Sequence, residues 1–305
     1  MERSPGARDV RVYLIDGTYE LFRHYFAVPS HVTAEGHEVG AIRGVLESVL
    51  NLLGERDVTH LGVATDHVIE SFRNELYAGY KTGEGIEPLL KAQFHPLELA
   101  LEAMGVVVWP MVEFEADDAM AAAASIAAAD PAVEQVVLLT PDKDLGQCVQ
   151  QDGRVVQFDR RMRKLIDYDA VIEKFGVPPS AIPDYLGLVG DTADGFPGLP
   201  GWGAKSTAAV LAKYGSLEQI PLNPGQWDVP GLRGAPKLCG ALVDHLADAL
   251  LFRTIATVRR DAITLDGGVE SLLWSGPTDA FDDVAARLES PGLVPRAQAL
   301  AARRT

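Results

Sequence analysis

The stretch Val10–Ile15, V-R-V-Y-L-I, followed at once by Asp16, decides the fold class of this chain. It is a short, mainly apolar run of the kind found in buried strands. Longer stretches with a helical pattern, such as Ile42–Leu53 and Ala116–Ala129, can cross between parallel strands. This alternation predicts an α/β fold with a doubly wound, mainly parallel sheet and helices on both faces. Three further strands are predicted at His60–Thr65, Val106–Trp109 and Gln135–Thr140.

The pattern changes at about Gly176, where helical segments broken by Gly and Pro clusters become dominant. We therefore predict two domains, a catalytic α/β domain over 9–175 and a helical subdomain over 176–290. Residues 1–8 and the Ala/Arg-rich chain after Pro295 are expected to be frayed.

Acidic residues recur directly after the predicted strands. Because the carboxyl ends of parallel strands meet at one edge of a sheet, their side chains are expected to share a crevice there. Asp191 and Asp194, in G-D-T-A-D-G, are expected to join them from the helical subdomain. The acids that follow strands are Asp16, Asp66, Glu115, Asp117, Asp118, Asp142 and Asp144.

Carboxylates gathered in this way predict a metal site. Like charges within a few ångströms oppose folding unless cations neutralise them, and oxygen ligands suit Mg²⁺ or Mn²⁺. Two such ions about 4 Å apart can activate a water and stabilise the leaving oxygen of a phosphodiester. A single Asp after a strand is more often a helix cap, but recurrence after four strands favours metal binding. No Cys/His spacing typical of zinc is evident.

The bulk composition restricts the function classes. With 27 Lys and Arg against 43 Asp and Glu, the net charge of −16 argues against a protein that coats DNA through a basic surface. A nucleic-acid function then requires many acids to be sequestered at a metal site. Two cysteines, Cys148 and Cys239, do not support a disulfide framework. The sequence contains no apolar run long enough for a bilayer, so we expect a cytoplasmic protein without a membrane partner.

Six segments, in this order, carry a resemblance to a known family. They are L-I-D-G-T-Y-E-L-F-R (14–23), F-R-N-E-L-Y-A-G-Y-K (72–81), E-A-D-D (115–118), T-P-D-K-D-L-G-Q (140–147), G-L-V-G-D-T-A-D-G-F-P-G-L-P-G-W-G-A-K (187–205) and Y-G-S-L-E-Q-I (214–220). Together they resemble the bacterial 5′→3′ exonuclease and flap endonuclease family, which includes the N-terminal nuclease domain of DNA polymerase I. The similarity extends from about residue 10 to residue 265.

The resemblance implies a PIN-like fold with a helical arch at about 72–95, through which a single-stranded 5′ end passes. It implies that all nine acids bind metal, with two Mg²⁺ or Mn²⁺ ions as cofactors. Arg23, Tyr80 and Lys81 match residues near the scissile phosphate, and Lys81 stands at the base of the arch.

A helix-hairpin-helix variant that grips duplex DNA is also implied, with a K⁺ ion as a further cofactor there. In physical terms, Gly201 and Gly203 permit a tight turn before a helix over 206–214, and backbone amides at such a turn bind phosphate. Lys205 adds a positive charge. An ordinary connection between two helices would also explain these glycines. Arg73 is a further candidate DNA contact.

Two positions depart from the family pattern. Glu84 stands roughly where the family carries a second basic residue in the arch, which is expected to weaken phosphate capture. Gly195 replaces the Asn that commonly follows the last metal-binding Asp, which removes a side-chain amide that could brace the loop.

The sequence therefore predicts a stand-alone, metal-dependent 5′→3′ exonuclease or flap endonuclease that hydrolyses DNA in replication or repair. Its expected partners are DNA with a 5′ end or flap and a replication or repair polymerase, and the protein is expected to be a monomer. Two alternatives stay open: a structure-specific DNA-binding protein with little catalysis, and a PIN-type nuclease that cleaves RNA.

Overall fold

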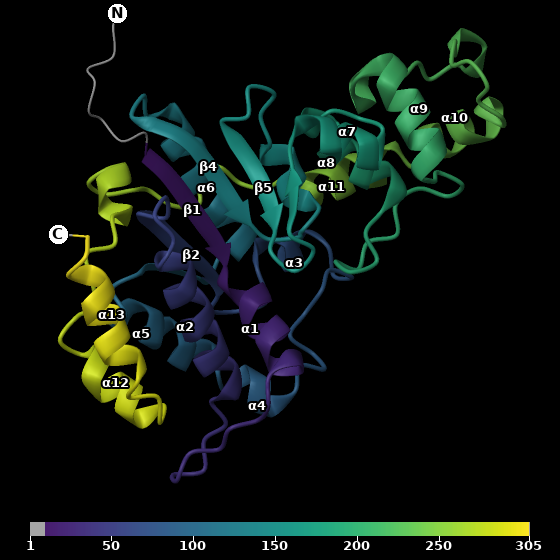
Figure 1. Ribbon diagram of the computed structural model, residues 1–305. Helices are drawn as coiled ribbons and strands as arrows, with labels where there is room; N and C mark the ends of the chain where they lie inside the picture. The colour runs from purple at the N-terminus through teal and green to yellow at the C-terminus, as the bar shows by residue number, and fades with distance from the viewer. Residues whose placement is uncertain (1–9, 305) are drawn as a thin grey trace, which may run out of the picture. The chain divides into compact units, whose positions relative to one another are not determined.

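The chain packs as two compact units in the computed structural model, which describes residues 10–304 (Figure 1). We call the first the sheet unit. It consists of residues 10–69, 83–140 and 260–304. The second, the helical unit, consists of residues 70–82 and 141–259. Each unit is therefore assembled from segments that are far apart in the sequence.

The sheet unit contains four parallel strands in the order β3-β2-β1-β4. The predicted strands and the predicted fold class are confirmed. From β1 the chain moves outward to β2 and β3 and then returns to place β4 on the other side of β1. This reversal makes the carboxyl ends of β1 and β4 the switch point at which open α/β sheets bind ligands. The strands are β1 (Val10–Asp16), β2 (His60–Asp66), β3 (Val107–Met111) and β4 (Val133–Leu139).

Helices cover the two faces of this sheet. The helix α6 packs on all four strands, and its buried alanines allow a close approach. The helices α1 and α5 contact β2 and pack against α2. Because crossovers between parallel strands are right-handed, reversal of the strand order places α6 on the face opposite these three helices. The helices of the sheet unit are α1 (Gly17–Ala27), α2 (Gly40–Leu53), α4 (Pro88–Lys91), α5 (Phe94–Ala103), α6 (Ala116–Ala129), η5 (Val269–Leu272), α12 (Phe281–Arg287) and α13 (Leu293–Ala301).

The chain after Pro295 is ordered as part of α13, so the prediction of a frayed tail is wrong. Leu293 and Ala297 are buried. Arg296 donates from Nη1 to both carboxylate oxygens of Glu47, at 2.7 and 2.6 Å, and from Nη2 to Asn51 Oδ1 at 2.9 Å. These contacts attach α13 to α2. Residues 1–8, also predicted to be frayed, lie outside the described residues.

The helical unit is built around a second apolar core. Phe196 is fully buried and stacks on Phe252, with ring centroids 5.5 Å apart. The region predicted as an arch, 72–95, carries only two short helices before α5 begins, α3 and α4. The domain limits 9–175 and 176–290 stay a prediction. The elements of the helical unit are α3 (Phe72–Leu76), η1 (Asp144–Cys148), β5 (Val155–Asp159), antiparallel to β6 (Lys164–Ile166), α7 (Tyr168–Phe175), η2 (Pro179–Ala181), α8 (Ile182–Val189), α9 (Ala204–Tyr214), η3 (Leu217–Gln219), η4 (Pro224–Gln226), α10 (Ala235–Asp244) and α11 (Leu246–Ala256).

Gly195 lies where the loop between α8 and α9 touches the segment that precedes Lys81. Its φ is +88°, and a Cβ atom built on it would lie 2.2 Å from the carbonyl oxygen of Gly79. The Lys81 N–H donates to the carbonyl of Asp194 at 2.9 Å. The loop is therefore braced by the main chain, and the absence of a side chain at 195 is what permits this approach.

We expect Gly195→Ala to destabilise the protein clearly more than Gly201→Ala. Gly201 also has a positive φ, +81°, but a Cβ atom there would have no neighbour within 4 Å. Both substitutions carry the strain of a left-handed residue, about 1–2 kcal/mol, and only Gly195→Ala adds a clash, which costs about 1–3 kcal/mol more. Chemical denaturation of both variants measures the difference. Equal losses would show that the approach to Gly79 is not a constraint.

Candidate active site

Asp16 ends β1 at the switch point of the sheet. Its Oδ1 accepts a hydrogen bond from the Tyr19 N–H at 2.8 Å, so it caps α1. Its Oδ2 accepts from the hydroxyl of Thr140, the residue after β4, at 3.2 Å. A carboxylate has about four lone-pair positions, so capping a helix does not prevent Asp16 from binding a metal ion.

Hydrogen bonds link Asp66 to the first turns of α1 and α6, and Glu115, Asp117 and Asp118 stand at the start of α6. The Asp66 N–H donates to Thr18 Oγ1 in the first turn of α1, at 2.8 Å. Asp66 Oδ1 accepts from the Ala116 N–H at the start of α6, also at 2.8 Å. There, Asp118 Oδ2 accepts from the Glu115 N–H at 3.0 Å. The sheet unit therefore collects five predicted metal ligands at the carboxyl edge of its sheet: Asp16, Asp66, Glu115, Asp117 and Asp118.

The helical unit brings three more of them into a tight group. Carboxylate oxygens of Asp144, Asp191 and Asp194 lie within 4.8 Å of one another, and Asp144 and Asp191 are buried. Asp142 stands beside them, because its Oδ1 accepts from the Asp144 N–H at 2.8 Å. Asp191 and Asp194 come from the loop between α8 and α9, which a pair of hydrogen bonds between Asp191 and Phe196 holds in shape.

This group is short of positive charge. Burial and the neighbouring Asp142 carboxylate raise the pKa of Asp144 well above its usual range. Burial also raises the pKa of Asp194, although Lys81 opposes the shift. Among the residues that the structure describes, Asp144 Oδ1 has no hydrogen-bond donor. A buried, repelling set of carboxylates with an unsatisfied oxygen matches the all-oxygen ligand set of a hard divalent cation.

Lys143 also lies in this group, and our sequence analysis did not select it. Its Nζ contacts Asp191 Oδ2 and lies 3.6 Å from Asp144 Oδ1. Burial alone would lower the pKa of the Lys143 ammonium, but the facing carboxylates, Asp144 above all, raise it. The only sequence signal was a lysine between two acids in T-P-D-K-D, a pattern equally typical of an exposed turn.

Lys81 faces the same group. Its Nζ lies 2.9 Å from Asp194 Oδ1 and sits over the Tyr80 ring, 5.4 Å from the ring centroid. The Tyr80 ring is buried in the core of the helical unit. This burial favours packing beneath Lys81 over the direct role near the phosphate that the resemblance implies for Tyr80.

Arg23 lies on α1 in the sheet unit. Its Nη2 donates to Oε2 of Glu20, a residue that is only 1% exposed. Glu20 is present in the first matching segment, but we did not select it from sequence. The ion pair neutralises the buried Glu20 carboxylate, and the Arg23 side chain is 28% exposed.

Arg73 is buried, in contrast to the DNA contact that we predicted. Its Nε donates to the Ile255 carbonyl at 2.8 Å, and its Nη2 to the Thr257 carbonyl at 3.2 Å. Since the guanidinium satisfies carbonyl groups at the end of α11, this geometry favours a structural role that ties α3 to α11.

The glycine turn before α9 has the geometry expected of an anion site. Gly201 needs its positive φ, and Gly203 is the N-cap of α9, which begins two residues earlier than predicted. Ser206 Oγ and the Gly203 N–H are joined by a hydrogen bond of 3.1 Å. Amides of the first turn have no acceptor within the helix, and Lys205 is exposed beside them.

Two protein-family models match this chain. Residues 11–176 match the N-terminal resolvase-like domain of 5′–3′ exonucleases, and residues 177–280 match their C-terminal SAM fold. The chain belongs to the 5′–3′ exonuclease family. The resemblance inferred from the sequence motifs is thereby confirmed.

Curated relatives of this exonuclease-family chain fall into two kinds. It is 35% identical to DNA polymerase I of Pseudomonas aeruginosa over 274 residues, which cover 87% of this chain but only 29% of the polymerase. It is 34% identical to a 5′–3′ exonuclease of Aquifex aeolicus over 213 residues, 70% of this chain and 72% of that protein. The chain thus spans less than a third of the length of the polymerase relative.

Among solved structures, the chain is similar to a flap endonuclease of bacteriophage T5 that was crystallised with DNA and metal ions. The TM-score is 0.61 at 18% identity, over 95% of this chain and 97% of the other. At 18% identity, this match supports the fold alone. No helix among residues 10–304 is both long and apolar enough to span a bilayer.

We expect Asp144→Asn to raise the melting temperature of the protein in EDTA at pH 7.5. The pKa of Asp144 is raised in the folded state, so its charge destabilises that state above the pKa of the unfolded chain. A rise of about 2–4 °C corresponds to about 1 kcal/mol. The gain should shrink as the pH falls through the raised pKa of the folded state, and it should disappear below the pKa of about 3.9 of an unfolded Asp, where Asp144 is protonated in both states.

Exposed Asp169→Asn in α7 is the matched control and should not show this gain. Addition of Mg²⁺ should stabilise the native protein more than Asp144→Asn. A variant that is less stable than the native protein in EDTA would contradict the interpretation of Asp144 as an uncompensated charge.

Proposed function

We propose that this exonuclease-family chain is a metal-dependent 5′→3′ exonuclease or flap endonuclease that hydrolyses phosphodiester bonds of DNA. The observation that carries the proposal is the group of Asp144, Asp191 and Asp194, which repel one another and are faced by Lys81 and Lys143. Asp144 and Asp191 are buried. Capping and packing do not require three carboxylates in one place. Support also comes from the names of the relatives, a 5′–3′ exonuclease and DNA polymerase I, and from the DNA and metal ions in the phage enzyme.

Both acid sets are proposed to hold Mg²⁺ or Mn²⁺, two ions in all. In the helical unit the ligands would be Asp142, Asp144, Asp191 and Asp194. In the sheet unit they would be the five acids at the carboxyl edge. When bound, such ions polarise a phosphodiester and supply a nucleophilic water near neutral pH.

The chain's own cations complete the proposed chemistry. Lys81 is held between Asp194 and the Tyr80 ring, so its ammonium has a fixed position from which to offset charge that develops on a phosphate in the transition state. Lys143 balances Asp191 and Asp144 before ions bind. Arg23, through its open side, would offer a further charge to the DNA backbone.

Duplex binding is proposed at the start of α9. The first-turn amides and Lys205 can hold a backbone phosphate, and Gly201 and Gly203 keep the approach free of side chains. A K⁺ ion at this turn is part of the proposal. Phosphate contacts do not read base sequence, so the enzyme should choose DNA by structure, a free 5′ end or flap. With a net charge of −16, its affinity should be modest and should depend on metal.

The proposed setting is DNA replication or repair, alongside a polymerase, with this chain acting as a monomer. One of the comparisons supports this setting, because the polymerase relative contains a segment like this chain.

The first test is cleavage of a 5′-flap DNA by the purified protein with Mg²⁺, with Mn²⁺ and with EDTA. We expect products that carry a 5′-phosphate in either metal and none in EDTA. Asp142→Ala should abolish cleavage without unfolding the protein, since Asp142 stands beside the three grouped acids. A matched RNA flap run in parallel measures strand preference.

Two outcomes would overturn the proposal. Tight flap binding without cleavage in either metal would make the chain a DNA-binding protein. Preferential cleavage of the RNA substrate would assign it to the RNA-cleaving PIN nucleases.

Lys81→Ala should lower kcat on the flap substrate by about 10²–10³-fold, the loss typical for one positioned donor. The control is Lys213→Ala, because Lys213 is likewise paired with an aspartate, Asp228 at 2.8 Å, but on the exposed surface. Lys213→Ala should retain activity. If both variants lose activity equally, a general loss of positive charge, and not the position of Lys81, explains the effect.

A further inference from the structure

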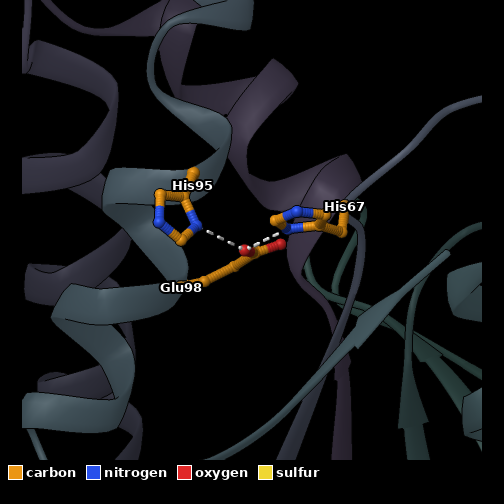
Figure 2. Close-up of side chains that lie close together, drawn as sticks. All are labelled: His67, His95 and Glu98. Atoms are coloured by element: carbon orange, nitrogen blue, oxygen red, sulfur yellow. Dashed lines mark hydrogen bonds and ion pairs between the residues drawn. The ribbon is translucent and has the colours of Figure 1, made fainter.

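A second group of potential metal ligands lies in the sheet unit, away from the acids at the carboxyl edge. Figure 2 shows His67 and His95 each turning a ring nitrogen toward the carboxylate of Glu98. Glu98 Oε2 lies 2.7 Å from His67 Nδ1 and 3.3 Å from His95 Nδ1. One ligand atom from each of the three residues falls within 4.8 Å of the other two.

Two elements of the fold create this group. His95 and Glu98 are three residues apart in α5, so both project from one face of the helix. Thr65, in β2, and His67, the first residue after β2, both contact Glu98 of α5, so both lie on the face of the sheet that α5 covers. Asp66, between them, instead reaches the Ala116 N–H of α6 on the opposite face. The histidine group is therefore distinct from the predicted nuclease acids.

Glu98 is fixed and buried while the two histidines reach solvent. The Glu98 side chain is only 4% exposed, against 37% for His67 and 63% for His95. The hydroxyl of Thr65 donates to the second carboxylate oxygen, Oε1, at 2.7 Å. Among residues 10–304, no Lys or Arg forms an ion pair with Glu98. A buried carboxylate is thus oriented by a hydrogen bond and faces two imidazoles at a solvent-accessible position.

We propose that His67, His95 and Glu98 form a binding site for a borderline divalent transition metal, Zn²⁺ foremost. Imidazole nitrogen with one carboxylate is a ligand set that suits Zn²⁺ and not Mg²⁺. Ligand atoms about 2.0–2.2 Å from a tetrahedral ion lie about 3.3–3.5 Å apart. The His95–Glu98 separation of 3.3 Å already fits this spacing, and the His67–Glu98 separation of 2.7 Å would lengthen by about 0.6–0.8 Å as the ion replaces the hydrogen bond. Water completes the coordination from the exposed side.

The site would clamp α5 to the end of β2. Thr65 acts as a positioning residue, since its hydrogen bond holds the ligating carboxylate in place, and losing such a contact typically weakens metal binding about 10–100-fold. The bound ion would stabilise the sheet unit by mass action. It would do so whether or not the protein is a nuclease.

The test is a titration of the metal-free, full-length protein with Zn²⁺ by calorimetry and with Co²⁺ by visible absorption. Co²⁺ in a four-coordinate histidine site gives intense visible bands, whereas an all-oxygen, six-coordinate site gives weak ones. We expect intense bands in the native protein that Zn²⁺ displaces. His95→Gln and, independently, His67→Gln should remove the bands and lower the Zn²⁺ stoichiometry by about one ion.

Two controls make the assignment specific. His245 also pairs with an acid three residues on, Asp248 at 3.0 Å, but has no second histidine, so His245→Gln should keep the bands. Asp144→Asn removes a carboxylate of the other acid group and should keep them too. Thr65→Val should retain the band shape with about 10–100-fold weaker affinity.

Several results would overturn the proposal. Native protein that gives only weak Co²⁺ bands, lost in Asp144→Asn, would show that metal binds solely to the acid group. Intense bands that persist in both His95→Gln and His67→Gln would place the ion elsewhere. In either case the three residues would be a hydrogen-bonded group without an ion.

Discussion

Repulsion among the carboxylates of Asp144, Asp191 and Asp194 is the constraint on which the helical unit depends. Burial removes the water that would screen them, so the fold must supply positive charge and hold the acids in place. Lys81 and Lys143 supply charge from two different segments. The Asp191–Phe196 hydrogen bonds and the stacking of Phe196 on Phe252 hold the loop. Among residues 10–304, Asp144 Oδ1 has no hydrogen-bond donor, although Lys143 Nζ lies 3.6 Å from it.

In the sheet unit, the order of the strands brings the acids together. Its strand order reverses at β1, so acids that follow different strands reach the same edge without long loops. Two of these acids also hold a neighbouring helix, since Asp16 caps α1 and Asp66 accepts from the first residue of α6. Helix capping and metal binding are therefore not competing explanations. The same hydrogen bonds that cap these helices also hold the carboxylates in place.

The two candidate metal sites differ in the chemistry of their donors. The acid groups offer hard oxygen ligands, whereas His67 and His95 offer nitrogen to a softer ion. Two adjacent residues contact different helices. Asp66, at the end of β2, accepts from the first residue of α6, and His67, just after β2, pairs with Glu98 of α5.

The sequence by itself determined the strands of the parallel sheet, the family, and the placement of acids after strands, because periodicity and motif order are local properties of the chain. Only the tertiary structure decided which residues meet. It buried Arg73 and Tyr80, paired Lys143 with Asp191, and made a glycine necessary at 195. It also joined His67 to Glu98, 31 residues away. Such contacts depend on strand order and on which helix covers which face, and no local spacing in the sequence records them.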